Sequence, residues 1–298
     1  MDTPAFFTPP TDVLFDFAWF PGRGQDVPAS KGFDSRLGEL ALRAQKENWS
    51  FDTDQPYGML NSYLRYTFKR LANQKGKILQ SADSGGTHVA LFNTGLFTPN
   101  YEVIFAFFEG NLNSSRQPWV FKDWVVESDR RIAFFKTKPA PARYFEKPGD
   151  LIYDPDRELI PNLDHILDEN ADRYPPDLRD NPHRRRMMLQ GAITEAAKRA
   201  QMNYKVAVPQ FFFGRDDHTG GHIQLLLPLY LNQPDRADLA LVVEPDWTAY
   251  AYRAFTVLPL DRAYSNARLI AKPETDWLTA PDTTAAWLQP GGPEKGAL

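Results

Sequence analysis

Residues 189–231, LQGAITEAAKRAQMNYKVAVPQFFFGRDDHTGGHIQLLLPLYL, decide the fold class of this chain. Their first part places apolar residues at helical spacing and predicts an amphipathic helix whose buried face is made by Leu189, Ile193, Ala196 and Ala200. Two strongly apolar segments follow, near residues 205–213 and 222–231, and both predict strands. Because the turn between them is short and rich in glycine, we expect the two strands to pair in opposite directions.

The remaining segments mix helices and strands without strict alternation. Helices are predicted from Asp34, which we interpret as an N-cap, from Gln55 to about Asn73, and at residues 100–108. Further strands are predicted at 77–79, 88–92, 119–126, 131–135, 238–244 and 249–258. A last helix, capped by Asp261, is predicted at 261–271. This order predicts an α+β fold with a central, largely antiparallel sheet, helices packed on it, and the N-terminal half forming a second layer.

The length of 298 residues and the 42% of hydrophobic residues are enough for a sizeable core. We expect a single compact domain over 13–278, with two intimately packed halves, 13–137 and 138–278, as the alternative. The segment 174–186 is rich in proline and arginine and predicts an exposed loop, either a mobile lid or a connector. Residues 279–298, rich in proline, glycine and alanine, predict a flexible tail.

Composition excludes several classes of function. The chain has no cysteine, so disulfides, thiolate catalysis and thiolate-ligated metals are excluded. A formal charge of -4 rules out nucleic-acid binding by bulk charge, so any such binding needs a local basic groove. The N-terminus lacks a basic flank and is interrupted by prolines, so we expect a cytoplasmic protein without a membrane partner.

No motif identifies a cofactor or a reaction. The sequence contains no nucleophile elbow, no phosphate-binding lysine loop and no zinc-protease helix motif. Asp216, Asp217 and His218, followed by His222, supply metal-ligand types, but the glycine turn between them favours a hairpin loop. We therefore predict no metal site, and the cofactor is left unassigned.

Polar residues inside apolar segments locate a candidate site. Lys205, Gln210, His222 and Gln224 lie in the two predicted strands of the opening stretch. A buried amine or amide costs a few kcal/mol unless it has a partner, so we expect each to be held by the protein or to face a ligand. For Lys205 the alternative to ligand binding is a buried ion pair with Asp238 or Asp261.

Two further groups could carry chemistry. Arg65 and Lys69 lie one turn apart on a predicted helix with Tyr66 beside them, so they could hold an anion while the ring supports a base; a solvated helix face is the alternative. His165, in a predicted short helix, could be an acid–base group oriented by Asp164 or Asp168, or could serve only in capping and packing.

Six separated blocks of the chain resemble an uncharacterised microbial family catalogued as a domain of unknown function: LFDFA (14–18), LRYTF (64–68), FNTGL (92–96), NYK with VPQ (203–210), IQLLLPL (223–229) and AYSNAR (263–268). The resemblance extends from about Val13 to Leu278. Some relatives are joined to RNA-binding modules of cold-shock or winged-helix type, which implies RNA or nucleotide chemistry by association. The matching blocks contain Arg65, Asn93, Lys205, Gln210, Gln224, Asn266 and Arg268.

These patterns predict a nucleic-acid- or nucleotide-directed, RNA-related protein that binds a phosphate-bearing ligand. We expect its phosphate to be held at one anion site by Arg65, Lys69, Lys205 and Arg268. The ligand-binding candidates are Arg65, Tyr66, Lys69, Asn93, Gln210, Gln224, Asn266 and Arg268. If the protein is an enzyme, phosphoester or nucleotidyl chemistry fits best, with His165 and Lys205 as catalytic candidates. The alternatives are a non-catalytic RNA or nucleotide sensor or adaptor, and a structural partner-binding domain; the sequence indicates no particular protein partner.

Overall fold

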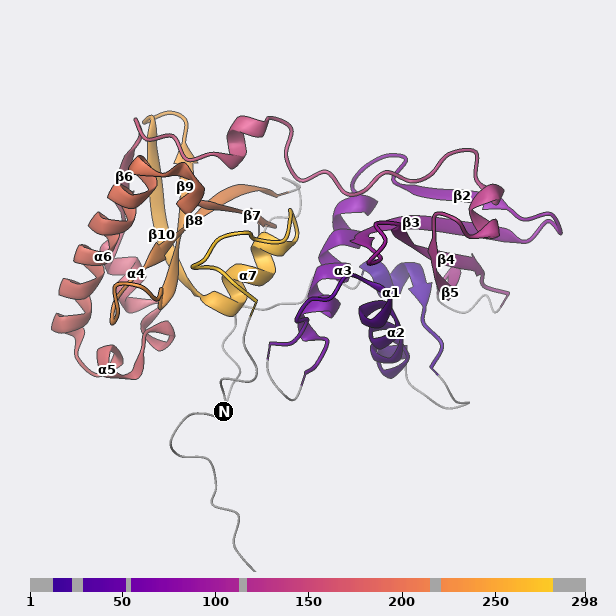
Figure 1. The fold of residues 1–298 in the computed structure, drawn as a ribbon, viewed down its shortest axis with the longest axis horizontal. Helices are drawn as coiled ribbons and strands as arrows, with labels where there is room; N and C mark the ends of the chain where they lie inside the picture. The colour runs from indigo at the N-terminus through magenta and orange to yellow at the C-terminus, as the bar shows by residue number, and fades with distance from the viewer. Residues whose placement is uncertain (1–12, 23–28, 52–54, 113–116, 215–220, 281–298) are drawn as a thin grey trace, which may run out of the picture. The chain divides into compact units, whose positions relative to one another are not determined.

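The computed structural model describes residues 13–22, 29–51, 55–112, 117–214 and 221–280 (Figure 1). The chain divides into two compact units, and the boundary between them lies between Ala142 and Arg143. Each unit contains its own five-stranded sheet. The predicted α+β class and largely antiparallel pairing are confirmed, although the prediction placed the sheet in the C-terminal half alone. Residues 281–298 of the predicted tail lie outside the described residues.

The N-terminal unit begins with its three α-helices and the short strand β1, and four further strands and a 3-10 helix follow. Its helices are α1 (Val13–Phe17), α2 (Ala29–Arg43) and α3 (Gly58–Ala72), and its short 3-10 helix is η1 (Arg130–Phe134). Its strands are β1 (Ala18–Trp19), β2 (Ile78–Ala82), β3 (His88–Phe97), β4 (Val103–Gly110) and β5 (Trp119–Val126). They form a sheet in the order β1-β5-β4-β3-β2, in which β1 pairs with β5 in parallel and the other pairs are antiparallel.

Side chains on the N-terminal sheet alternate between two buried faces. On one face, Phe92 and Phe108 stack at 5.5 Å between ring centroids, and Phe68 of α3 packs against Phe92. On the other face, Phe105 and Phe107 join a second apolar cluster with Ile132 of η1. Because both faces are covered, β3 is apolar at every position from Val89 to Phe92 and β4 from Val103 to Phe108, which hides the strand period in the sequence.

Three predictions for this unit are wrong. The predicted helix 100–108 is instead strand β4, because its apolar run is paired on both edges, with β3 and with β5. The predicted strand 131–135 is the 3-10 helix η1, capped by the side chain of Asp129. Asp34 lies inside α2 rather than at its N-cap.

The C-terminal unit places most of its helices between β6 and β7, ahead of four successive strands. Its helices are α4 (Leu163–Asp168), α5 (Pro176–Arg179), α6 (Pro182–Met202) and α7 (Leu260–Arg268), with 3-10 helices η2 (Pro148–Leu151), η3 (Ala171–Arg173) and η4 (Tyr204–Val206). Its strands are β6 (Glu158–Pro161), β7 (Val208–Phe212), β8 (His222–Leu229), β9 (Leu239–Asp246) and β10 (Ala251–Pro259). The sheet order is β6-β10-β9-β8-β7, with β6 parallel to β10 and the rest antiparallel.

The two faces of the C-terminal sheet are covered differently. One face packs on α4, α5 and α6 in a single core that includes Leu225, Leu227 and Val243. The apolar side of α6 that the sequence predicted is buried in this core. Helix α7 packs on the opposite face, near β7, and is seen on the other side of the sheet from α6 (Figure 1). In the middle of this face the side chains are buried, with Leu226 0% and Val242 5% exposed, whereas His222 and Glu244, at the end where β8 begins and β9 ends, are half exposed. We refer to this half-exposed end, which includes Phe212, His222, Glu244 and Arg253, as the open face.

Two predictions for this unit are wrong. The segment 174–186 is not an exposed loop or lid, because most of it forms α5 and the start of α6, and Tyr174 and Arg185 are buried. The side chain of Asn181 caps α6, so a proline-rich segment begins a helix here instead of avoiding one. Asp261 lies in the first turn of α7, whose N-cap is Pro259. There its carboxylate still suits the helix dipole.

Candidate functional site

A row of polar side chains crosses the face of the C-terminal sheet on which α7 packs, and it ends at the open face. Gln210 of β7 is paired directly with Gln224 of β8, and Glu244 of β9 directly with Arg253 of β10. The register between β8 and β9 places Leu225 opposite Val243, so Gln224 and Glu244 are also opposite each other. Side chains of directly opposite residues point to the same face. The four therefore form one line across four strands.

Hydrogen bonds connect this line from α7 to the sheet centre. Asn266 of α7 donates from Nδ2 to Gln210 Oε1 at 3.1 Å, and Gln210 Nε2 donates to Gln224 Oε1 at 2.9 Å. Gln224 Nε2 then donates to Glu244 Oε2 at 3.1 Å. Because each amide donates in the same direction, the orientation of one fixes the next. We refer to Asn266, Gln210, Gln224 and Glu244 as the amide row.

The amide row ends in a histidine–carboxylate pair. Nε2 of His222 lies 3.1 Å from Glu244 Oε1, and each side chain is 42% exposed, whereas Gln210 is 1% exposed. The contact with Glu244 raises the pKa of His222, and partial burial opposes this. The contact with His222 lowers the pKa of Glu244 in turn. The row thus leads from buried amides to a half-exposed group that can exchange a proton near neutral pH.

Neighbouring groups extend the surface at both ends. Phe212, 40% exposed, is paired with His222 across β7 and β8, and the two rings meet edge to face at 5.7 Å. On β10, Arg253 Nε donates to Asp246 Oδ2 at 3.2 Å. The open face therefore offers an aromatic ring, an imidazole, a guanidinium and two carboxylates within one sheet surface.

The structure brings some of the predicted site residues together and separates others. Gln210, Gln224 and Asn266 meet in the amide row. Asn93 lies in the N-terminal unit and holds a strand irregularity in β3, because its Nδ2 donates to Pro139 O and its Oδ1 accepts from Gly95 N. The side chain of Asn93 therefore makes these hydrogen bonds within the N-terminal unit.

The predicted cation pair lies on α3 of the N-terminal unit. Lys69 is 8% exposed, so it does not belong to a solvated face, and Tyr66 is partly buried. The Arg65 guanidinium carbon lies 5.7 Å from the ring centroid of Phe15. Lys205 and Arg268 belong to the other unit, so convergence of all four cations on one anion stays a prediction.

Of the two catalytic candidates, His165 is partly buried and Lys205 is exposed. His165 lies on α4, and its Nδ1 is 2.9 Å from Glu169 Oε1 rather than from Asp164 or Asp168. Lys205 is exposed on η4, so the prediction that it lies within an apolar strand is wrong. It forms no ion pair with Asp238 or Asp261 among the described contacts. Helix α4 packs on the sheet face opposite the amide row, and a catalytic role for His165 and Lys205 stays a prediction.

Sequence analysis missed Glu244, Arg253 and Asp246 as parts of this surface. Their signal is weak but present: Glu244 interrupts the apolar run LALVV of β9, and Arg253 lies between alanines and aromatics in β10. His222 and Gln224, both selected from the sequence, lie two residues apart on β8 and share a face. Only the cross-strand register shows that these residues lie opposite one another.

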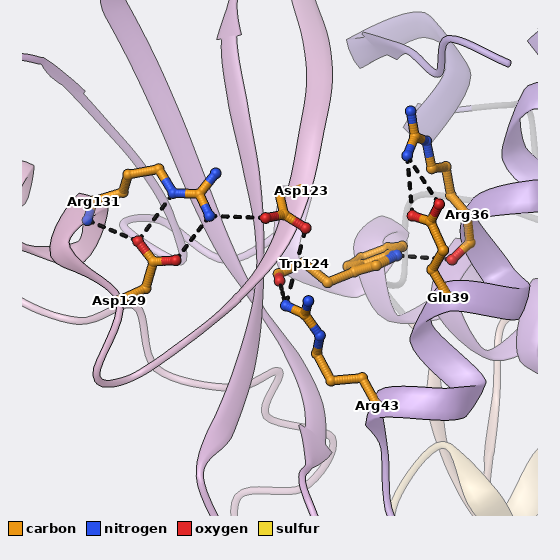
Figure 2. Close-up of polar contacts among 7 residues, drawn as sticks. All are labelled: Arg36, Glu39, Arg43, Asp123, Trp124, Asp129 and Arg131. Atoms are coloured by element: carbon orange, nitrogen blue, oxygen red, sulfur yellow. Dashed lines mark hydrogen bonds and ion pairs between the residues drawn. The ribbon is translucent and has the colours of Figure 1, made fainter. Parts of the chain in front are cut away.

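A second polar cluster, in the N-terminal unit, is built for stability (Figure 2). Asp123 of β5 lies 2.8 Å from Arg131 Nη2 and 3.9 Å from Arg43 Nη1, while Arg131 also bonds Asp129 at 2.7 Å. Arg43 donates to the main-chain oxygen of Trp124. The Arg131 bond lowers the pKa of Asp129. These contacts join α2, β5 and η1, and Arg43 binds the β5 backbone at Trp124, beyond the two residues at which β1 pairs with β5.

Metal and membrane features can be judged within the described residues. No group of three or more His, Asp or Glu side chains is placed there to hold a metal ion. Asp216, Asp217 and His218 lie outside the described residues. No helix of the described ranges has both the length and the apolar character needed to cross a membrane.

A family model described as a domain of unknown function (DUF3825) matches residues 40–277. The chain belongs to the DUF3825 family. This confirms the family resemblance, while the association of relatives with RNA-binding modules stays a prediction. No curated protein and no solved structure matches the chain. The DUF3825 match contains the whole amide row, His222 and Arg253.

Proposed function

We propose that this DUF3825 protein binds single-stranded RNA or a nucleotide on the open face of its C-terminal sheet. The observation that carries the proposal is the amide row, which crosses strands of a hydrophobic sheet and ends in the half-exposed His222–Glu244 pair. Three amides in a line cost more to bury than apolar residues of similar size. In return for this cost, the amides hold Glu244 and His222 in one orientation toward the open face.

The chemistry of this face suits an unpaired base. Proteins recognise single-stranded RNA with sheet surfaces that offer a ring for stacking and polar groups for the base edges. Phe212 is 40% exposed beside His222 and supplies the ring. Glu244 accepts hydrogen bonds, and His222 and Arg253 donate them. The phosphate of the ligand would meet Lys205 and Arg268, which belong to the same unit.

Binding is tested with the full chain and a labelled single-stranded oligoribonucleotide of mixed sequence, with ATP as a competing nucleotide. Fluorescence anisotropy measures the affinity. We expect His222→Asn and Gln224→Leu each to weaken binding about tenfold, the effect of losing about 1.4 kcal/mol of recognition. His183→Asn is the matched control, because His183 is an exposed histidine of α6 in the same unit.

Two results would overturn the proposal. One is a wild-type chain that binds neither the oligoribonucleotide nor ATP. The other is unchanged affinity in both variants when circular dichroism shows that they are folded. If His222→Asn and Gln224→Leu lose no more affinity than the control His183→Asn, the open face is not the binding site.

The phosphoester alternative is favoured by one observation, the pairing of His222 with Glu244. A carboxylate that orients an imidazole and raises its pKa is a common arrangement for general acid–base catalysis. Incubating the full chain with labelled RNA and resolving the products on a gel tests for cleavage. Activity that is lost in His222→Asn assigns the role to this pair, and activity lost in His165→Asn assigns it to α4. No cleavage leaves the protein a binder.

A further inference from the structure

The turn between β9 and β10 exposes two aromatic side chains that are held by a buried arginine. Trp247 is 69% exposed and Tyr250 is 54% exposed. The guanidinium carbon of Arg157 lies 4.3 Å from the Trp247 ring centroid and 4.6 Å from that of Tyr250, while Arg157 itself is 5% exposed. One side of each ring therefore covers the arginine, and the rest of each ring is open to solvent. We refer to Trp247 and Tyr250 as the aromatic tip.

The aromatic tip is fixed from below by a set of polar contacts. Arg157 Nε lies 3.2 Å from Asp154 Oδ2 and its Nη1 donates to Asp246 O at 3.4 Å. Tyr250 Oη donates to the same Asp154 oxygen at 3.1 Å. Tyr250 has a φ of 50°, in the left-handed region that an ordinary residue adopts only against steric strain. The fold thus keeps two exposed rings in place at a conformational cost.

The surroundings of the tip are acidic. Arg157 is balanced by Asp154, and Arg253 by Asp246. Asp156 and Glu158 are exposed, and neither forms an ion pair with another described residue. The tip therefore has a local excess of negative charge, which repels a phosphate backbone and attracts a cation.

We propose that the aromatic tip is a docking site for an arginine- or lysine-bearing peptide of a partner protein. The face of an aromatic ring attracts a cation, most strongly for tryptophan. The inner sides of both rings already hold one guanidinium, and their outer sides present the same chemistry to solvent. Asp156 and Glu158 supply the negative charge that guides a basic segment to the rings. This site uses none of the side chains of the amide row.

The test uses the full chain and labelled peptides of equal length: one of alternating arginine and glycine, one of alternating lysine and glycine, and one of alternating glutamate and glycine. Anisotropy should show binding of the two basic peptides and none of the acidic one. Trp247→Ala should weaken binding of the arginine peptide about tenfold. Asp156→Asn with Glu158→Gln should weaken it severalfold, more at low salt than at high salt.

Tyr101→Ala is the matched control, because Tyr101 is 76% exposed and also has a positive φ, of 63°, at a turn between strands of the N-terminal unit. It should leave peptide binding unchanged. Thermal melts of each variant show whether it is folded; Trp247 is exposed, so its removal should have little effect. Failure of wild type to bind either basic peptide overturns the proposal, as does equal binding by Trp247→Ala. If Trp247→Ala instead loses binding of a single-stranded oligoribonucleotide and not of peptide, the tip is a nucleic-acid site.

Discussion

Replacing Gln210 by leucine should destabilise the C-terminal unit by about 2 kcal/mol. The change removes two hydrogen bonds, to Gln224 Oε1 at 2.9 Å and from Asn266 Nδ2 at 3.1 Å. Gln224 is 7% exposed, so its stranded oxygen costs about 1–3 kcal/mol. Asn266 is partly exposed and can bond water instead, at a cost of about 0.5 kcal/mol. The added apolar surface of leucine offsets part of this sum.

A double variant measures the energetic coupling between Gln210 and Gln224. Gln210→Leu with Gln224→Leu removes both partners of the central bond, and Glu244, being 42% exposed, can take water in place of Gln224 Nε2. Replacing both partners by apolar groups is nearly neutral when the shapes match. The double variant should therefore be more stable than the sum of the single variants by about 1 kcal/mol or more.

Urea unfolding of the full chain measures these differences, followed by circular dichroism and tryptophan fluorescence and fitted to two transitions if the units unfold separately. Wild-type stability in Gln210→Leu would refute the energetic argument, and strict additivity would show that the two glutamines are not coupled. The double variant also tests function: a stable protein that still binds the oligoribonucleotide like wild type would make the amide row purely structural.

Three further outcomes follow from single positions. The pKa of His222 is raised from 6.5 and that of Glu244 lowered from 4.5, so their pair should stabilise the fold between these values and lose the effect as pH rises through the folded pKa of His222. Because both groups are half exposed, we expect the unfolding free energies of wild type and His222→Asn to differ by roughly 0.5 kcal/mol near pH 6 and to converge near pH 9; a constant difference would contradict this. Gly95→Ala should cost about 2 kcal/mol or more, because Gly95 has a φ of 75° and a Cβ would lie 2.5 Å from Tyr63 Oη; an unchanged Tm would disprove the clash. Tyr153→Phe should be neutral or stabilising by up to about 1 kcal/mol, since the Tyr153 hydroxyl has no hydrogen-bond partner among the described residues and burial raises its pKa to about 12; a marked fall in Tm would reveal a partner.

Sequence reasoning succeeded where a local pattern coincides with the tertiary contacts. The apolar face of α6 and the strands β7 and β8 were predicted because helical and strand periods are visible in their residues. Strands at the positions of β2 and β3 were predicted as well, and the two pair in opposite directions. It failed at β4, because a strand covered on both faces has no period to distinguish it from a buried helix.

For the candidate site, the sequence identified polar residues within apolar segments but not how these residues are arranged in space. Gln210, Gln224 and Asn266 were selected because amides are costly in apolar segments, and they do meet. Lys205 was selected on the same ground and is exposed, because its segment leaves the strand and forms η4.

The sequence by itself determined that the chain has no cysteine chemistry, that it belongs to the α+β class, and that polar residues lie within its apolar C-terminal strands. Tertiary structure alone decided that Glu244 and Arg253 complete the row and that Arg157 lies beneath Trp247. The physical reason is that these contacts join different strands and segments, and Arg157 comes long before Trp247 in the chain. The register of the strands is set by pairing across the whole sheet, so the sequence of one strand does not show which residue of its neighbour will lie opposite each position.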